Sequence, residues 1–446
     1  MALDLDRARA RLAATDPIAV RGRVRAVVGM TIHASIPGVR LGELVAIERR
    51  DRPPLYAEVV GFERDDATLL PLGDPRGTGP DDVVTRSAAP ASVPVSDAIL
   101  GRVIDALGAP IDGGPDIVGD PQPIVRAAPA PMRRPRIDTA MVTGVRAIDG
   151  LLTLGHGQRI GLFAGSGVGK STLLGRIARR ADADVIVVGL VGERGREVAE
   201  LIEDSLGEEG LARAVVVVAT SDEPALLRVR AAWTATAIAE HFRDRGQRVL
   251  LLLDSVTRFA RAAREVGLAA GEPPTRRGYP PSVFAELPRL VERAGRADTG
   301  TITAIYTVLV EGGDLDEPVA DEVRGVLDGH IVLSRALAAR GRWPAIDPLA
   351  SLSRVMDRVT DEAHRAAARA VRQHIATYEA KRDLVLLGAY ERGSDPALDA
   401  ALARVDAIEA FLRQEPDEAS SLDDATARLA ALVATAPSAP RARSSS

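Results

Sequence analysis

The sequence contains no cysteine, which excludes disulfide bonds, thiolate metal sites and cysteine nucleophiles. Aromatic residues make up only 3% of the chain. No segment approaches the ~18 uncharged apolar residues that a bilayer span needs. The first residues, MALDLDRARARLAATDP, interleave acids with arginines, whereas a secretory signal has an apolar stretch. These absences fit a protein of a reducing, cytoplasmic compartment.

Lysine is also scarce. Only Lys170 and Lys381 are lysines, and every other basic residue is arginine. Most cationic positions in the chain therefore accept a guanidinium, and the two exceptions need a reason. Lys381 lies in a polar, helix-like stretch, where chance is the better explanation, whereas Lys170 ends a glycine-rich segment. The formal net charge of −5 argues against a general polyanion-binding surface.

Length and composition indicate a globular protein of several domains. The chain has 446 residues, of which 46% are apolar and 27% charged, and this length suggests about three domains. Continuous apolar strands such as QRIGLFA, VIVVGLVG and RVLLLLD alternate with helical segments, which predicts a parallel sheet covered on both faces. The expected regions are a charged helix at 1–18, a small β-barrel or sandwich at 19–95, an α/β core at 96–360 that includes a connector with six prolines at 113–137, and an α-helical domain with a frayed tail at 361–446.

A phosphate-binding loop is predicted where Lys170 stands. The segment AGSGVGKS follows the strand QRIGLFA and opens the helix STLLGRIARR, the context that such a loop requires. Backbone N–H groups would converge on the phosphates, the Lys170 ammonium would neutralise β and γ oxygens, and the Ser171 hydroxyl would ligate Mg²⁺. The predicted nucleotide-binding residues of this loop are Gly165, Ser166, Gly167, Val168, Gly169, Lys170, Ser171 and Thr172.

Two acids at strand ends could complete the site. Asp254 ends the strand RVLLLLD, where it could hold Mg²⁺ through water, cap the next helix, or do both. Glu193 ends the strand VIVVGLVG and could polarise the water that attacks the γ-phosphate. Taken alone, Glu193 would be read as a surface carboxylate paired with an arginine. Considered together with the predicted phosphate-binding loop, Glu193 is better interpreted as a catalytic residue.

Together these residues resemble the ATPase of type III protein secretion, the family of the injectisome and flagellar export ATPases, and the chain is similar to the β subunit of rotary ATP synthases. The match includes GSGVGKSTLL, VGLVGERGREV, DSVTRFARAAREVGLAAGEPPTRRGYPPSVFAELPRLVERAG, WPAIDPLASLSRVM and LGAYERGSDP. The resemblance implies a RecA-like P-loop core between an N-terminal β-barrel and a C-terminal helical domain.

The resemblance also assigns residues and partners. Lys170 and Glu193 would be catalytic, Asp254 would lie in the outer shell of the metal, and Arg354 would be a finger that enters the neighbouring subunit's site. Trp343 falls where relatives carry a tyrosine that stacks on adenine, a role that an indole can also perform. The implied cofactors are ATP and Mg²⁺. The implied partners are other copies in a homohexamer, stator and central-stalk proteins, chaperone–cargo complexes and the export gate at the cytoplasmic face of the inner membrane, with no nucleic acid.

Several alternatives stay open. One is the ATP synthase β subunit, although no acidic DELSEED-like patch for a rotor is visible. An RNA translocase of the same superfamily would need stacking aromatics, and residues 1–100 contain only Tyr56 and Phe62. A non-catalytic nucleotide-binding subunit would be expected to lack Glu193. Within the family, ATSDEPALLR and VLVEGGDLDEPVADE resemble injectisome members more than flagellar ones.

Overall fold

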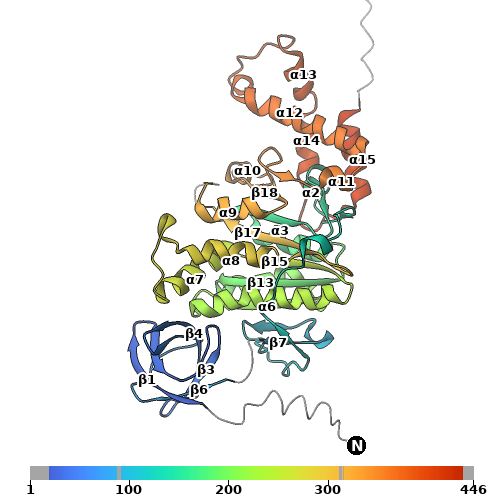
Figure 1. Cartoon of the computed structure of the whole chain (residues 1–446). Helices are drawn as coiled ribbons and strands as arrows, with labels where there is room; N and C mark the ends of the chain where they lie inside the picture. Colours follow the sequence, from blue (N-terminus) through green and yellow to red (C-terminus); the bar gives the residue numbers. More distant parts are fainter. Residues whose placement is uncertain (1–19, 88–91, 311–313, 315, 435–446) are drawn as a thin grey trace, which may run out of the picture.

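The computed structural model describes residues 20–87, 92–310, 314 and 316–434. Figure 1 shows three parts in succession: a β-barrel, a central sheet covered by helices, and a group of C-terminal helices at the end away from the barrel. This arrangement confirms the predicted fold class. The helix expected at 1–18 and the last part of the tail lie outside the described residues.

The N-terminal domain is a closed barrel rather than a sandwich. Its strands follow each other around the barrel in the order β1-β2-β5-β4-β3-β6. In β3, Val45 and Ile47 are buried while Leu44 and Ala46 are half-buried, the alternation that lets one face of a strand fill a barrel. The strands are β1 (Arg21–Val28), β2 (Thr31–Ser35), β3 (Leu44–Ile47), β4 (Leu55–Glu63), β5 (Asp66–Pro71) and β6 (Val83–Arg86).

The barrel ends earlier than the boundary expected at residue 95. β7 (Ser92–Val95) pairs with β9 (Asp120–Pro123) of the proline-rich connector in a separate two-stranded ribbon. Pro94, Pro121 and Pro123 lie in these two strands. Because proline lacks an N–H group, such strands are confined to sheet edges, and a two-stranded ribbon consists of edges only.

The central sheet is parallel except for short edge pieces. Its order is β19-β18-β12-β17-β15-β13-β14-β8, with β16 paired antiparallel to β17 and β19 antiparallel to β18. Every residue of β13 is buried, as expected for a strand covered on both faces. The strands are β8 (Val103–Asp105), β12 (Arg159–Ala164), β13 (Val185–Glu193), β14 (Ala214–Thr220), β15 (Arg248–Asp254), β16 (Gly295–Arg296), β17 (Thr301–Leu309), β18 (Gly329–Leu333) and β19 (Leu352–Ser353).

Helices cover both faces of this sheet. One face packs against α6 (Ala225–Asp244), α7 (Val256–Ala269), α8 (Pro281–Val291) and α9 (Pro318–Val326). The other face packs against α2 (Arg146–Leu151) and α3 (Lys170–Arg180), and against residues of the C-terminal helices. The shorter elements are β10 (Ala140–Met141), β11 (Leu154–Gly155), α4 (Gly195–Glu200), a π-helical turn (Leu201–Leu206), α5 (Gly207–Ala212), α10 (Arg335–Ala339) and α11 (Met356–Val359). No helix in the described ranges has the length and apolarity needed to cross a membrane.

The C-terminal helices are α12 (Glu362–Leu386), α13 (Pro396–Leu402), α14 (Val405–Leu412) and α15 (Leu422–Val433). They share an apolar core with the sheet through Ile408, Phe411 and Leu429. Arg146 at the start of α2 strengthens this joint, because its side chain is 2% exposed and its Nε donates to the Phe411 carbonyl at 3.0 Å. The same guanidinium contacts the Arg413 carbonyl and the Glu418 carboxylate.

We predict that Arg146→Ala destabilises the chain by about 2–4 kcal/mol, because it leaves buried carbonyl groups without a donor. Urea unfolding followed by circular dichroism would measure the change. Arg369→Ala is the matched control, because Arg369 forms only an exposed ion pair with Glu362. Equal free energies of unfolding for the two variants would show that Arg146 does not hold the helices to the core.

Candidate functional site

The predicted site residues meet at one edge of the sheet. β12, β15 and β13 run parallel, so their carboxyl ends lie together. Lys170 follows the loop after β12, Asp254 ends β15 and Glu193 ends β13. Ligands of open α/β sheets bind at this edge, and the sequence had placed all three residues there.

The phosphate-binding loop has the backbone form that its glycines permit. Gly169, immediately before α3, has a φ of +80°, a left-handed conformation that favours glycine. A Cβ atom at this position would lie 2.8 Å from the Trp343 ring. Trp343 therefore lies against the loop, and at 44% exposure it is not a core residue.

Lys170 is held between the two acids. Its Nζ lies 2.5 Å from Oδ1 of Asp254 and 3.5 Å from Oε1 of Glu193. The hydroxyl of Thr307 on β17 also donates to Oδ1 of Asp254, at 2.7 Å. Both carboxylates are buried, and a buried carboxylate needs such partners to remain charged. The ammonium predicted to bind phosphate thus lies between two buried acids.

Glu193 has a strongly perturbed acidity. Burial, followed by the neighbouring Glu197 carboxyl and the charge of Asp254, raises the pKa of Glu193 to about 8, against the opposing effects of Lys170 and Arg258. The interaction with Glu193 in turn lowers the pKa of Glu197. A carboxyl group with a pKa near the working pH suits a general base.

Asp254 does not cap the following helix. The cap of α7 is Ser255, whose hydroxyl accepts from the Arg258 backbone N–H at 3.3 Å. Of the two roles considered for Asp254, metal binding is the one that its position leaves open. Ser171 is exposed in the first turn of α3, and a hydroxyl with a carboxylate offers the hard oxygen donors that Mg²⁺ prefers. Among the described residues, no group of three or more His, Cys, Asp or Glu side chains could hold a metal ion.

Arg354 lies far from the loop of its own chain. Its backbone N–H donates to the Asp328 carbonyl, and the preceding Ser353 pairs with Gly329 at the start of β18. β18 runs parallel to β12, so Arg354 lies at the end of the sheet opposite the phosphate-binding loop. The side chain is exposed, and it forms no hydrogen bond or ion pair with the residues that the structure describes. The structure does not bring Arg354 together with Lys170 and Glu193.

Two arginines of the site were missed in the sequence. Arg258 on α7 lies 3.2 Å from Oε2 of Glu193 and also donates to the Gly192 carbonyl. Arg335, the first residue of α10, approaches the loop at Gly165. In a chain this rich in arginine, single arginines carry no signal in the sequence. The segment DSVTRF, which contains Arg258, was informative only as part of a family motif.

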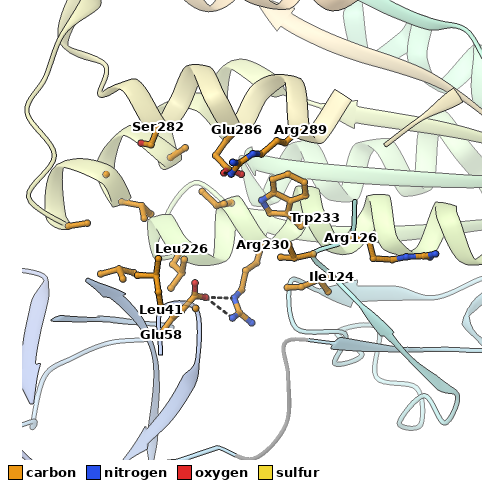
Figure 2. Close-up of a pocket in the computed structure, with 18 of the residues that line it drawn as sticks. Leu41, Glu58, Ile124, Arg126, Leu226, Arg230, Trp233, Ser282, Glu286 and Arg289 are labelled. Atoms are coloured by element: carbon orange, nitrogen blue, oxygen red, sulfur yellow. Dashed lines mark hydrogen bonds and ion pairs between the residues drawn. The ribbon is translucent and has the colours of Figure 1, made fainter. Parts of the chain in front are cut away.

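A separate cavity of about 960 Å³ lies between the barrel and the core. It is lined by β4, the connector, α6, α7 and α8, and the ion pair between Glu58 and Arg230, at 2.6 Å, joins its two sides (Figure 2). None of the predicted nucleotide-binding residues lines this cavity. It is therefore distinct from the site at the sheet edge.

Comparison with known proteins agrees with this geometry. The model of the ATP synthase alpha/beta family, nucleotide-binding domain, matches residues 144–353, and that of the T3SS EscN ATPase C-terminal domain matches residues 360–431. A type 3 secretion system ATPase from Xanthomonas euvesicatoria is 54% identical over 405 residues, which cover 90% of this chain and 92% of the relative. The chain belongs to the family of type III secretion and flagellar ATPases.

Other members of the family match to a similar degree. The flagellum-specific ATP synthase of Bacillus subtilis is 50% identical over 422 residues, covering 94% of this chain and 96% of the relative. The structure of the assembled ATPase EscN from the type III secretion system of enteropathogenic E. coli matches with a TM-score of 0.87 at 45% identity, and the match covers 93% of this chain and 100% of that chain. The suspected family and the fold that it implied are both confirmed.

We predict that Lys170→Arg lowers ATP turnover by roughly 100-fold or more, the size of losing one transition-state donor. A guanidinium fork is too large for a backbone cradle that fits an ammonium. Steady-state phosphate release would measure the effect. Lys381→Arg is the matched control, because Lys381 forms a partly exposed pair with Asp395 that arginine can also make. Similar turnover of the two variants would exclude a special role for Lys170.

We also predict that kcat/KM for ATP rises with pH, about tenfold per unit below the pKa of Glu193, which is about 8, and levels off above it. The sign follows because only the ionised carboxylate can accept a proton. Glu197→Gln should move the inflection to lower pH, because the neutral amide can donate to the ionised Glu193 carboxylate, whereas the Glu197 carboxyl favours the protonated form. A profile that falls with pH over this range would contradict the assignment of Glu193 as the base.

Proposed function

We propose that this chain hydrolyses ATP in a homohexameric ring and thereby drives chaperone release, unfolding and export of proteins through a type III secretion system. The observation that carries the proposal is the meeting of Lys170, Glu193 and Asp254 at one sheet edge beside the phosphate-binding loop. This is the minimal set for phosphoryl transfer to water: a cation for phosphate, a base for water and an acid for the metal.

The reaction follows from what each residue can do. Entry of the triphosphate gives the Lys170 ammonium a new anionic partner. Ser171, and Asp254 through water, would hold Mg²⁺, which neutralises charge on the phosphate oxygens when bound. Glu193, oriented by Arg258 at 3.2 Å, polarises the attacking water and accepts its proton.

Arg354 supports a site shared between subunits. Its exposed side chain at the opposite end of the sheet is unsuited to its own loop but free to enter a neighbour's. A guanidinium placed on the γ-phosphate contributes about three to five orders of magnitude in rate. The ring is therefore proposed to complete each active site, with Arg354 as the catalytic finger in trans and Trp343 as the adenine-stacking residue.

We assign the chain to the injectisome branch on the segments ATSDEPALLR and VLVEGGDLDEPVADE. The identities, 54% to an injectisome relative and 50% to a flagellar one, are similar, so the flagellar export ATPase is the second candidate. Neighbouring genes distinguish the two: needle and export-gate components support the injectisome, whereas hook and filament components support the flagellum.

The proposed surroundings are the cytoplasmic face of the inner membrane, where stator, central-stalk, export-gate and chaperone–cargo proteins would meet the ring. A solved complex of EscN with its central stalk EscO matches this chain with a TM-score of 0.85 at 46% identity. This likeness supports a stalk partner for the present chain.

We predict that Glu193→Gln and Arg354→Ala each bind ATP but hydrolyse it at least about 1,000-fold more slowly. Mixing the two variants in equal amounts should restore activity at about a quarter of the interfaces of a randomly assembled ring. There an intact Glu193 meets an intact Arg354 from the neighbour. Phosphate release across a series of mixing ratios would measure the recovery.

The control for this experiment is a chain that carries both substitutions, mixed with either single variant, which should restore nothing. Absence of recovery at every ratio of the single variants, in rings verified by size, would contradict a shared site. Turnover of Glu193→Gln near that of the unaltered chain would remove Glu193 from the mechanism.

A further inference from the structure

Trp343 is attached to the C-terminal helices at two successive residues. The guanidinium of Arg342, which is 4% exposed, lies 3.0 Å from Oε1 of Glu409 on α14. The carbonyl of Trp343 itself accepts from the Gln414 backbone N–H at 2.9 Å. The indole, in turn, lies against Gly169 of the phosphate-binding loop. The position of the ring therefore depends on residues more than sixty positions away in the sequence.

Both ends of the Gln414 side-chain amide are hydrogen-bonded. Its side chain is buried, its Oε1 accepts from the Arg146 backbone N–H at 2.8 Å, and its Nε2 donates to the Gly144 carbonyl at 3.1 Å. A buried amide with both ends satisfied holds its backbone in one position. Because that backbone carries the bond to Trp343, the amide determines where the tryptophan carbonyl is held.

The same loop is tied to the phosphate-binding helix. Arg176 on α3 is 4% exposed and donates to the carbonyls of Glu415 at 2.9 Å and of Gln414 at 3.4 Å. α3 begins with Lys170. The loop after α14 thus contacts both sides of the nucleotide site: the phosphate side through α3 and the base side through Trp343.

We propose that Gln414 and Glu409 are positioning residues for the base side of the nucleotide site, and that through Trp343 they link base recognition to the C-terminal helices. This inference rests on the proposed binding of ATP with Trp343 on adenine. Neither residue touches nucleotide. Both act by fixing the ring that does, so their loss weakens recognition of the base while the phosphate contacts and the chemical step remain.

The test uses the full chain in a Trp233→Phe background, since the sequence has only two tryptophans and Trp343 then reports alone. Titration with ATP and with tripolyphosphate gives affinities with and without the base. For Gln414→Ala and Glu409→Ala we expect ATP affinity to fall roughly fivefold, the size of one net hydrogen bond, with tripolyphosphate affinity and kcat unchanged. Arg413→Ala is the matched control, because its exposed side chain lies between these positions in the sequence and forms no hydrogen bond or ion pair with the described residues.

Glu409 is 38% exposed in its side chain, so Glu409→Ala tests the inference even if Gln414→Ala fails to fold. Unchanged ATP affinity and unchanged Trp343 emission in Glu409→Ala would overturn it. Equal losses of ATP and tripolyphosphate affinity would also overturn it, because they would indicate general loosening. If the Trp233→Phe chain hydrolyses ATP without a change in Trp343 emission, only this inference fails. If it does not hydrolyse ATP at all, the proposed function fails.

Discussion

The buried charge cluster around Lys170 is the constraint on which the site depends. One ammonium lies against two buried carboxylates, Asp254 at 2.5 Å and Glu193 at 3.5 Å, and Arg258 supplies a second cation. Charges with few water contacts are tolerated only when they neutralise one another. Lys170 therefore stabilises the buried charge of Asp254, whereas burial raises the pKa of Glu193 to about 8.

The parallel sheet places these charges, and the C-terminal helices add a second level of control. The sheet brings three strand ends to one edge, so the charges converge although their residues are scattered over more than eighty positions. Arg146, Arg176 and Gln414 then join the loop after α14 to the face of the sheet that carries α3. A movement of the C-terminal helices would therefore displace the loop after α14 and Trp343. These contacts connect α3 and Trp343 with the part of the chain farthest from the barrel (Figure 1).

Much of the fold was predictable because its signals are local. The apolar strands around QRIGLFA and RVLLLLD, and the glycines before Lys170, predicted the core and its loop from residue patterns alone. The proline-rich connector was also recognised, but its pairing with β7 was not. The two strands are short and some twenty-five residues apart, so no periodic pattern in the sequence indicates that they pair. The helical character of the C-terminal region was predicted, but the break between α13 and α14 at Ala403 and Arg404 was not.

By itself, the sequence determined the identity of the chemical groups: a phosphate-binding loop, a lysine retained in a chain of arginines, and two acids at strand ends. These follow from residue type and spacing along the chain. The tertiary structure decided which groups share a site. In the folded chain, Arg258 forms an ion pair with Glu193, and the Gln414 backbone donates a hydrogen bond to the Trp343 carbonyl. Ser255 caps α7, and Arg354 lies at the end of the sheet opposite the phosphate-binding loop. Such contacts join distant segments through packing and burial, and a linear pattern cannot encode distances that arise only when the sheet is assembled.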